Sequence, residues 1–355
     1  MTLTDIAQQR LATQRLTQQP FATPEEVVSW LGCVQSQEYA GAKWSLGMRM
    51  QNATEAAIDE AFNEGRILRT HIMRPTWHFV TPDDIRWILE LTAPRVNALN
   101  ASYYRQQELD EALFVRSNDI IVKALEGGKQ LTRAELGVVL AQSGIVTDAM
   151  RLGFIMHRAE LDAIVCSGGR RGKQFTYALL NERAPHAKSL PRDEALAELT
   201  RRYYTGHGPA TVHDFVWWSG LTIADAKAGI QMVGSQLAHE VIDGKTYWFS
   251  ASITPSAEPS EKAFLLPTFD EFLVGFDAFD KARTGGRGFS DSASYSMSPL
   301  VFAGKVIGSW KRTFKKKSVV IELQPFEPLT AAEMDTFTIA TQRYGEFHGM
   351  PAMLG

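Results

Sequence analysis

The sequence predicts a mixed α+β fold that is mainly helical, with three tandem winged helix-turn-helix units and a small C-terminal β-rich domain. Two observations predict it. The order helix, helix, helix, β-hairpin recurs along residues 1–250, and this order is the plan of a winged helix-turn-helix. Beyond residue 250, Pro255 and Pro259 mark a linker. Short β-type runs and a last helix follow it.

The first unit, placed at residues 1–100, has helices expected near residues 24–34 and 55–64. Thr23 offers an N-cap hydroxyl, and Pro24 suits the first helical position. Thr81-Pro82 repeats this pattern and predicts another helix start. An extended pair follows the second of these helices, at Leu68–Met73 and Thr76–Val80.

The second and third units are placed at residues 101–188 and 189–252. Capping boxes mark helix starts at Thr132 and, in a weaker form with aspartate, at Thr211 and Thr222. Asp243-Gly244 between alternating apolar residues is a strong hairpin signal. The expected helices lie near 117–126, 132–142, 148–160, 193–205, 211–219 and 222–232, and the expected strands at Ala163–Cys166, Gln174–Leu179, His239–Ile242 and Lys245–Phe249.

The C-terminal domain is placed at residues 260–355. Thr330 begins a capping box and predicts the last helix at 331–345. A glycine-rich loop that carries Lys281, Arg283 and Arg287 separates the second and third β-type runs. The runs are Ala263–Leu266, Phe272–Phe276, Leu300–Phe302, Val306–Trp310 and Val319–Leu323.

The composition is that of an ordinary globular protein, with 355 residues, 45% hydrophobic and 22% charged. It excludes a wholly disordered chain, and no apolar run reaches the length of a membrane span. A net charge of −3 argues against a protein coated in positive charge. Cys33 and Cys166 form no disulfide framework, and no secretion signal is visible, so we expect two reduced, buried thiols and a cytoplasmic protein.

Positive charge is concentrated in two short segments. Arg170, Arg171 and Lys173 lie in a glycine-rich turn of the second unit, where a wing tip would contact phosphate or the minor groove. Lys315 and Lys316 belong to a basic run that is expected to form a hairpin tip and to bind DNA. In both segments the alternative is a solvated basic turn. The helix at 55–64 is acidic and would be repelled by phosphate.

Two glutamines, Gln35 and Gln37, follow the helix that starts at Pro24. Residues two apart do not share a helix face. Their side chains converge on one site only if the helix ends before them and the chain becomes extended. Taken alone, the two glutamines are weak evidence for an active site, since polar residues are common at helix ends.

Further segments give the pair a context. The chain resembles the winged-helix DNA-glycosylase superfamily over nearly its whole length. The segments that carry the resemblance are Val34–Gln37, Trp44–Leu46 with Arg49, Arg69-Thr70, Met73–His78, Gly208–Thr211, Asp214–Leu221, Leu265–Asp270 and Gly304–Trp310.

The resemblance implies a function and a set of site residues. The Gln-x-Gln motif of the AlkZ-like branch matches Gln35 and Gln37, which would be catalytic, with Ser36 at a middle position that is usually aliphatic. Arg74 in the first hairpin would contact the DNA backbone or form a surface salt bridge. His78 would support the pocket, or be a hydrogen-bonded structural histidine. The expected partner is duplex DNA carrying alkylated purines, with no metal, no organic cofactor and no membrane, for a protein that acts as a monomer.

The chemistry of two carboxamides fits this activity. An amide is neutral, with one acceptor oxygen and two N–H donors. It cannot be a strong base, but it can position a water. A purine alkylated at N3 or N7 is already cationic and leaves as a neutral base. Such a site therefore suits alkylpurines, those in interstrand crosslinks included, and is inadequate for undamaged nucleotides.

Other readings of the sequence are weaker. His71 and His78 have no third ligand in a zinc-like pattern. Asp270, Glu271, Asp277 and Asp280 suggest a carboxylate metal site, but a structural role is favoured for them. Two other functions stay open: a noncatalytic DNA-binding protein or transcription regulator, and an interaction scaffold with vestigial winged helices.

Overall fold

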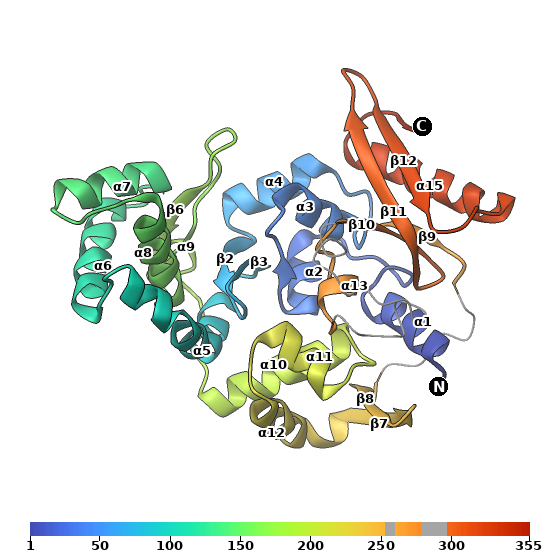
Figure 1. Cartoon of the computed structure of the whole chain (residues 1–355), viewed down its shortest axis with the longest axis horizontal. Coiled ribbons are helices and arrows are strands. Elements are labelled where there is room, and N and C mark those ends of the chain that lie inside the picture. The colour runs from blue at the N-terminus through green and yellow to red at the C-terminus, as the bar shows by residue number, and fades with distance from the viewer. Residues whose placement is uncertain (253–259, 278–296) are drawn as a thin grey trace. The chain divides into compact units, whose positions relative to one another are not determined.

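The structure, a computed structural model, describes residues 1–252, 260–277 and 297–355 (Figure 1). The glycine-rich loop with Lys281, Arg283 and Arg287 lies outside the described residues, as does Asp280. The chain divides into two compact units. Unit 1 comprises Met1–Asp59, Thr200–Trp218 and Thr222–Gly355, and unit 2 comprises Glu60–Leu199 and Ser219–Leu221. The four domain boundaries predicted from the sequence stay a prediction.

The helices and strands follow the predicted order closely. Up to residue 106 they are α1 Leu3–Thr13, α2 Pro24–Leu31, β1 Val34–Gln35, α3 Tyr39–Gly47, α4 Glu55–Glu64, β2 Leu68–Ile72, β3 Thr76–Val80 and α5 Ile85–Gln106. The next group is α6 Glu111–Leu125, β4 Leu131–Thr132, α7 Arg133–Gln142, α8 Ala149–Leu161, β5 Val165–Ser167, β6 Thr176–Leu179 and α9 Leu180–Arg183.

The third group is α10 Arg192–Gly206, α11 Val212–Ser219, α12 Ile223–Val233, the 3₁₀ turn η1 Gly234–Gln236, β7 Leu237–Ile242 and β8 Lys245–Ser250. The C-terminal elements are β9 Ala263–Leu265, α13 Glu271–Val274, β10 Ser298–Phe302, β11 Lys305–Phe314, β12 Val319–Pro325, α15 Ala331–Phe347 and β13 Ala352–Leu354. The mixed, mainly helical fold class is confirmed.

Capping residues begin the predicted helices. Thr23, Thr132, Thr222 and Thr330 each form a full capping box with the acidic residue three positions later. One prediction is wrong by a turn: α5 begins at Ile85 and not directly after Thr81. The Thr81 hydroxyl donates to the Asp84 carboxylate at 2.6 Å, so the threonine stabilises a turn that precedes the helix.

The second winged helix lies within unit 2. Strands β5 and β6 pair antiparallel, with β4 on the other side of β6. Helices α6, α7 and α8 bury one shared core, to which Ile121, Leu136 and Ile155 contribute, each fully buried. The β2–β3 hairpin, in the same unit, pairs Thr70 with His78.

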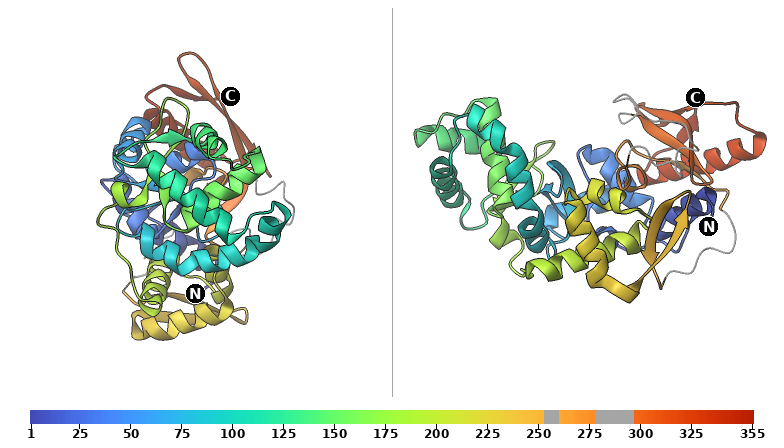
Figure 2. Two further views of the ribbon diagram at one scale, coloured as in Figure 1. Left: turned by 90° about the vertical axis from the view of Figure 1, so that its left-hand side faces the viewer. Right: turned by 60° about the horizontal axis from the view of Figure 1, so that its bottom comes forward.

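In unit 1, β7 and β8 form the predicted hairpin around Asp243-Gly244. Helix α1, which the sequence analysis did not predict, lies beside it, as the right-hand view of Figure 2 shows. Ile6 of α1 and Tyr247 of β8 are buried together, with Leu3 and Ile242 packed against them.

The C-terminal sheet has the strand order β13-β12-β11-β10-β9, and β13 runs parallel to β12. Helix α15 packs against this sheet (Figure 1). The expected strand at Phe272–Phe276 is wrong, because its first residues belong to α13. A short apolar run does not distinguish a strand from a buried helix. Here Asp270 caps the helix: its carboxylate accepts a hydrogen bond from the backbone N–H of Phe272 at 2.9 Å.

Glu55 of α4 contacts Lys43 and His348, both in unit 1. Lys43 Nζ lies 2.7 Å from one carboxylate oxygen, and His348 Nδ1 lies 2.9 Å from the other. The hydrogen bond from His348, helped by Lys43, lowers the pKa of Glu55 from 4.5 to about 2. A lowered carboxyl pKa stabilises the fold above the unfolded pKa, and this stability is lost as the pH falls through the folded value.

We therefore expect Glu55→Gln to lower the melting temperature at pH 7. The difference from the wild type should shrink as the pH falls from 4.5 toward 2. Thermal melts across this range measure it, with Glu60→Gln, exposed on the same helix, as the control. If the difference in melting temperature between Glu55→Gln and the wild type stayed constant with pH, the lowered pKa of Glu55 would be contradicted.

Candidate active site

The two glutamines lie in the connection between α2 and α3. Helix α2 ends at Leu31, and Gly32 follows with φ +80°, a left-handed conformation that glycine adopts without a Cβ penalty. The chain then extends through β1. Helix α3 begins at Tyr39, where the Glu38 carboxylate accepts hydrogen bonds from the backbone N–H groups of Ala40 and Gly41. The helix end and the extended chain that the motif requires are therefore both present.

The three residues of the motif differ in exposure. Gln35 is 6% exposed and Ser36 is fully buried, whereas Gln37 is exposed. The small serine thus occupies a covered position, which suits the usually aliphatic middle residue. Gln37 therefore lies at the surface, and Gln35 is largely enclosed.

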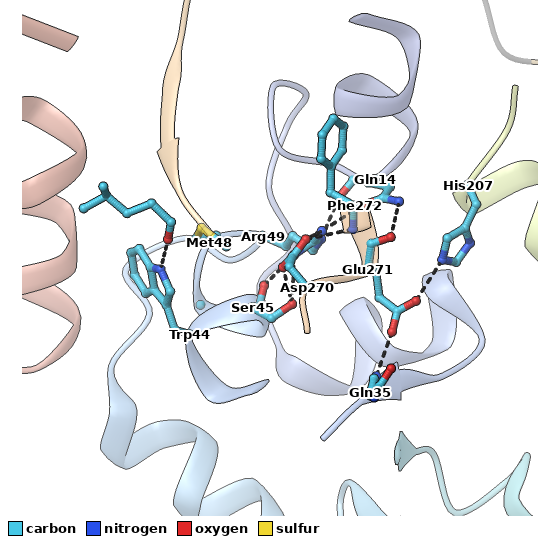
Figure 3. Close-up of polar contacts among 12 residues, drawn as sticks. Gln14, Gln35, Trp44, Ser45, Met48, Arg49, His207, Asp270, Glu271 and Phe272 are labelled. Carbon is cyan, nitrogen blue, oxygen red and sulfur yellow. Dashed lines mark hydrogen bonds and ion pairs between the residues drawn. The ribbon is translucent and has the colours of Figure 1, made fainter. Parts of the chain in front are cut away.

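A buried carboxylate fixes the backbone of Gln35 (Figure 3). Glu271 Oε1 accepts the backbone N–H of Gln35 at 2.7 Å. Its other oxygen accepts the indole N–H of Trp218 at 3.0 Å and lies 3.2 Å from His207 Nε2. Glu271 and His207 are both fully buried. Since a buried carboxylate with several donors is held in one place, this cluster sets the position of β1.

The neighbouring residue, Asp270, forms a second buried group with Arg49. Two guanidinium nitrogens of Arg49 lie 2.8 and 2.9 Å from the two carboxylate oxygens, and the Ser45 hydroxyl donates to Asp270 at 2.6 Å. Burial raises the pKa of Asp270, but Arg49 and the hydrogen bonds outweigh it, so the pKa is lowered overall. Arg49 also donates to Gln14, whose amide donates to the backbone carbonyl of Glu271 at 3.1 Å.

Glu271, His207 and Gln14 are the residues that the sequence analysis did not assign to this site. They are distant from Gln35 in the sequence. The Phe269-Asp270-Glu271 segment was the available signal, because two adjacent acids in an apolar context indicate buried, hydrogen-bonded carboxylates. Asp270 is structural, as expected. Among the described residues, no three His, Cys, Asp or Glu side chains are grouped to hold a metal ion.

Arg74 and His78 belong to the β2–β3 hairpin of unit 2. Arg74 lies in the turn and is partly buried, and the Thr76 N–H donates to its carbonyl at 2.6 Å. His78 is fully buried, with Nδ1 2.9 Å from the carbonyl of Thr76. The structure therefore gives His78 a hydrogen bond within its own strand.

The basic wing tip connects β5 and β6 of unit 2. Arg171 is paired with Glu135 at 2.7 Å and donates to the carbonyl of Gln130 at 2.8 Å. Arg170 contacts Asn63 through its backbone N–H and lies over the ring of Phe175. Lys173 is exposed. Of the three predicted cations, the lysine is therefore best placed to meet a phosphate.

Lys315 and Lys316 lie at the tip of the β11–β12 hairpin, both exposed, as the sequence predicted. The backbone N–H of Lys315 donates to the carbonyl of Ser318 at 2.8 Å, which closes the turn. In helix α8, by contrast, Arg158 pairs with Asp162 at 2.7 Å and with Glu111 at 3.0 Å. The guanidinium of Arg158 is thus already engaged by carboxylates.

Cys33 and Cys166 are buried and are not joined in a disulfide, as predicted. Burial raises the pKa of Cys166 to about 12, so its thiol stays protonated at neutral pH. Within the described part of the chain, none of the helices has the length and apolar character of a membrane span.

The winged-helix units, the C-terminal sheet and the anchored Gln-x-Gln connection together define the class of winged-helix proteins that the sequence resembles. Residues 28–347 match the family model described as DNA glycosylase AlkZ-like. The chain belongs to the AlkZ-like DNA glycosylase family, whose members are hydrolases acting on N-glycosyl bonds.

Two relatives from Streptomyces sahachiroi support this assignment. The "Interstrand DNA cross-link repair glycosylase" is 24% identical over 319 residues, and the match covers 85% of each chain. The solved structure of "DNA glycosylase AlkZ" superposes with a TM-score of 0.79 at 18% identity, over 100% of both chains. The resemblance and the fold inferred from the sequence are confirmed.

Proposed function

We propose that this DNA glycosylase releases purines alkylated at N3 or N7 from duplex DNA, with Gln35 and Gln37 positioning the attacking water. One observation carries the proposal: the backbone of Gln35 is held by the buried Glu271 at 2.7 Å. Positioning catalysis requires such a rigid support, because small displacements of the catalytic groups reduce the rate strongly.

The substrate class follows from the charge of the amides. A neutral carboxamide supplies hydrogen bonds without removing a proton completely. Hydrolysis then depends on a base that departs without being protonated by the enzyme. A cationic alkylpurine meets this condition. Amide oxygens and the DNA phosphates would stabilise the positive charge that develops on the sugar.

Crosslinks formed by alkylation are a second substrate of the same chemistry, since they join two cationic purines. The name of the Streptomyces relative supports this extension. We further propose that the enzyme acts as a monomer on the nucleoid, in a reducing cytoplasm, without a metal or organic cofactor.

Base release from a single lesion tests the proposal. Purified protein is incubated with a duplex that carries one N7-methylguanine, and abasic sites are converted to strand breaks and counted. We expect breaks at the lesion and none at undamaged purines. Sequence-selective binding of intact duplex without any base release would instead favour the noncatalytic regulator.

The exposed lysines give a separate prediction on DNA affinity. We expect Lys173→Ala to weaken binding on all sequences alike and to reduce the slope of log affinity against log salt by about one. The double variant Lys315→Ala/Lys316→Ala should reduce it by up to about two. Titrations at several salt concentrations measure the slope.

Lys305→Ala is the matched control, since Lys305 is exposed at the opposite end of β11 from Lys315. Its slope should equal that of the wild type. If the tip variants and Lys305→Ala behaved alike, neither hairpin tip would contact phosphate.

A further inference from the structure

A cavity of about 420 Å³ lies in unit 2, within the second winged helix and the β2–β3 hairpin. The aromatic rings of Trp77, Tyr103, Phe154 and Tyr177 line it. Tyr103 and Phe154 are stacked, with an interplanar angle of 19°. Flat aromatic walls of this kind favour a planar, apolar-faced ligand.

Glu160 of α8 also lines this cavity and is fully buried. Its Oε2 lies 2.5 Å from Nδ1 of His71. Its Oε1 is shielded from solvent and has no hydrogen-bond partner among the described residues. A buried polar atom without a partner is costly and rare in native proteins, so each case requires an explanation.

His157 adds a second such atom. It lies three residues before Glu160 on α8, so both side chains lie on one face of the helix. The amide nitrogen of Asn100 lies 3.4 Å from its Nδ1. Because an amide nitrogen is a donor, Nδ1 accepts and the proton is on Nε2. That Nε2 is also buried and lacks a partner within the described part of the chain.

Burial favours the neutral form of all three groups. Burial raises the pKa of Glu160 to about 8, against the opposing effects of His157, Arg69, Arg133 and a hydrogen bond from the backbone N–H of His71. Burial lowers the pKa of His71 to about 3 and that of His157 to about 4. The protonated Glu160 then donates to His71, and its Oε1 is left as an acceptor. One acceptor and one N–H donor thus belong to two residues that line the cavity from the same face of α8.

A metal ion does not explain this arrangement. The direct contact of 2.5 Å between His71 and Glu160 occupies the atoms that would coordinate it. In the described ranges, this cluster is not among groups suited to hold a metal.

We propose that this cavity binds a planar heteroaromatic molecule that presents a hydrogen-bond donor beside an acceptor on one edge. The donor of the ligand pairs with Glu160 Oε1, its acceptor pairs with His157 Nε2–H, and its ring lies among the aromatic walls. The amino group and N1 of adenine form such an edge. The ligand reaches the cavity either as a free molecule or as an unpaired base of DNA. This site goes beyond the proposed function and is tested by binding alone.

The test is calorimetric titration of the full-length protein with free adenine and with purine, which lacks the amino donor. Titration with a duplex that carries one bulged adenine, and with the fully paired duplex, shows whether the ligand is an unpaired base of DNA or a free molecule. Glu160→Leu removes the acceptor, His157→Phe removes the donor, and Met150→Trp fills the cavity from a residue that is 60% exposed. Glu160→Gln keeps an acceptor oxygen, and the exposed His186→Ala is the control.

We expect adenine, free or bulged, to bind at least tenfold more tightly than purine or paired DNA. Glu160→Leu, His157→Phe and Met150→Trp should remove this preference, whereas Glu160→Gln and His186→Ala should keep it. If thermal melts show that Glu160→Leu and His157→Phe do not fold, the test rests on whether Met150→Trp removes the preference for adenine. Equal binding across all variants, loss with Glu160→Gln, or no preference for adenine in either form would overturn the proposal.

Discussion

Replacing Gln35 and Gln37 together by alanine is expected to slow N7-methylguanine release by about 100-fold or more. Removing one preorganised hydrogen-bonding group from an active site typically costs about 10²–10³ in rate. The anchor of the motif is a backbone hydrogen bond to Glu271, and alanine keeps that N–H. Single-turnover base release at saturating enzyme measures the loss.

The control is Gln51→Ala, which removes an exposed glutamine of the same unit. Its rate should match that of the wild type. The double variant should still bind lesion-containing DNA, so that the defect lies in the chemical step. A double variant that released base at the wild-type rate would remove Gln35 and Gln37 from the mechanism, while the family assignment would stand.

Asp270→Ala is expected to lower the free energy of unfolding by about 3–5 kcal/mol, because it leaves the Arg49 guanidinium buried without its carboxylate. Both partners are fully buried. At about 2–4 °C per kcal/mol for a domain of this size, the melting temperature should fall by about 10 °C. Denaturant titration and thermal melts measure the change.

The double variant Asp270→Ala/Arg49→Met should recover a large part of this loss, because it removes the uncompensated charge as well. Glu64→Ala, which breaks an exposed pair with Arg66, should leave stability nearly unchanged. If Asp270→Ala and Glu64→Ala had the same small effect, the buried pair would not be a main support of this unit.

Local signals in the sequence account for most of the elements. Thr23, Thr132, Thr222 and Thr330 mark helix starts, because a hydroxyl that caps a helix depends only on residues within one turn. Asp243-Gly244 marks a hairpin for the same reason. The Gln-x-Gln motif was also found from residues that are adjacent in the chain.

Helices α3 and α13 do not follow from the sequence, because their residue patterns are set by distant contacts. Residues 41–47 of α3 are all buried, so the helix lacks the polar face that produces a 3.6-residue period. The apolar residues of α13 are compatible with a strand or a helix, and only the cap that Asp270 forms in the folded chain identifies the helix.

The order of residues was therefore sufficient for the fold class and the family resemblance, and it predicts the two glutamines as catalytic residues. It did not reveal what holds them. Glu271, which holds the backbone of Gln35, lies 236 positions from it in the sequence. In the second winged helix, the proposed acceptor is a Glu160 oxygen without a partner among the described residues. The proposed donor is His157 Nε2–H, whose assignment depends on the contact of His157 with Asn100. Such contacts form only when the folded chain buries polar groups that are far apart in sequence, and burial then determines both their partners and their protonation.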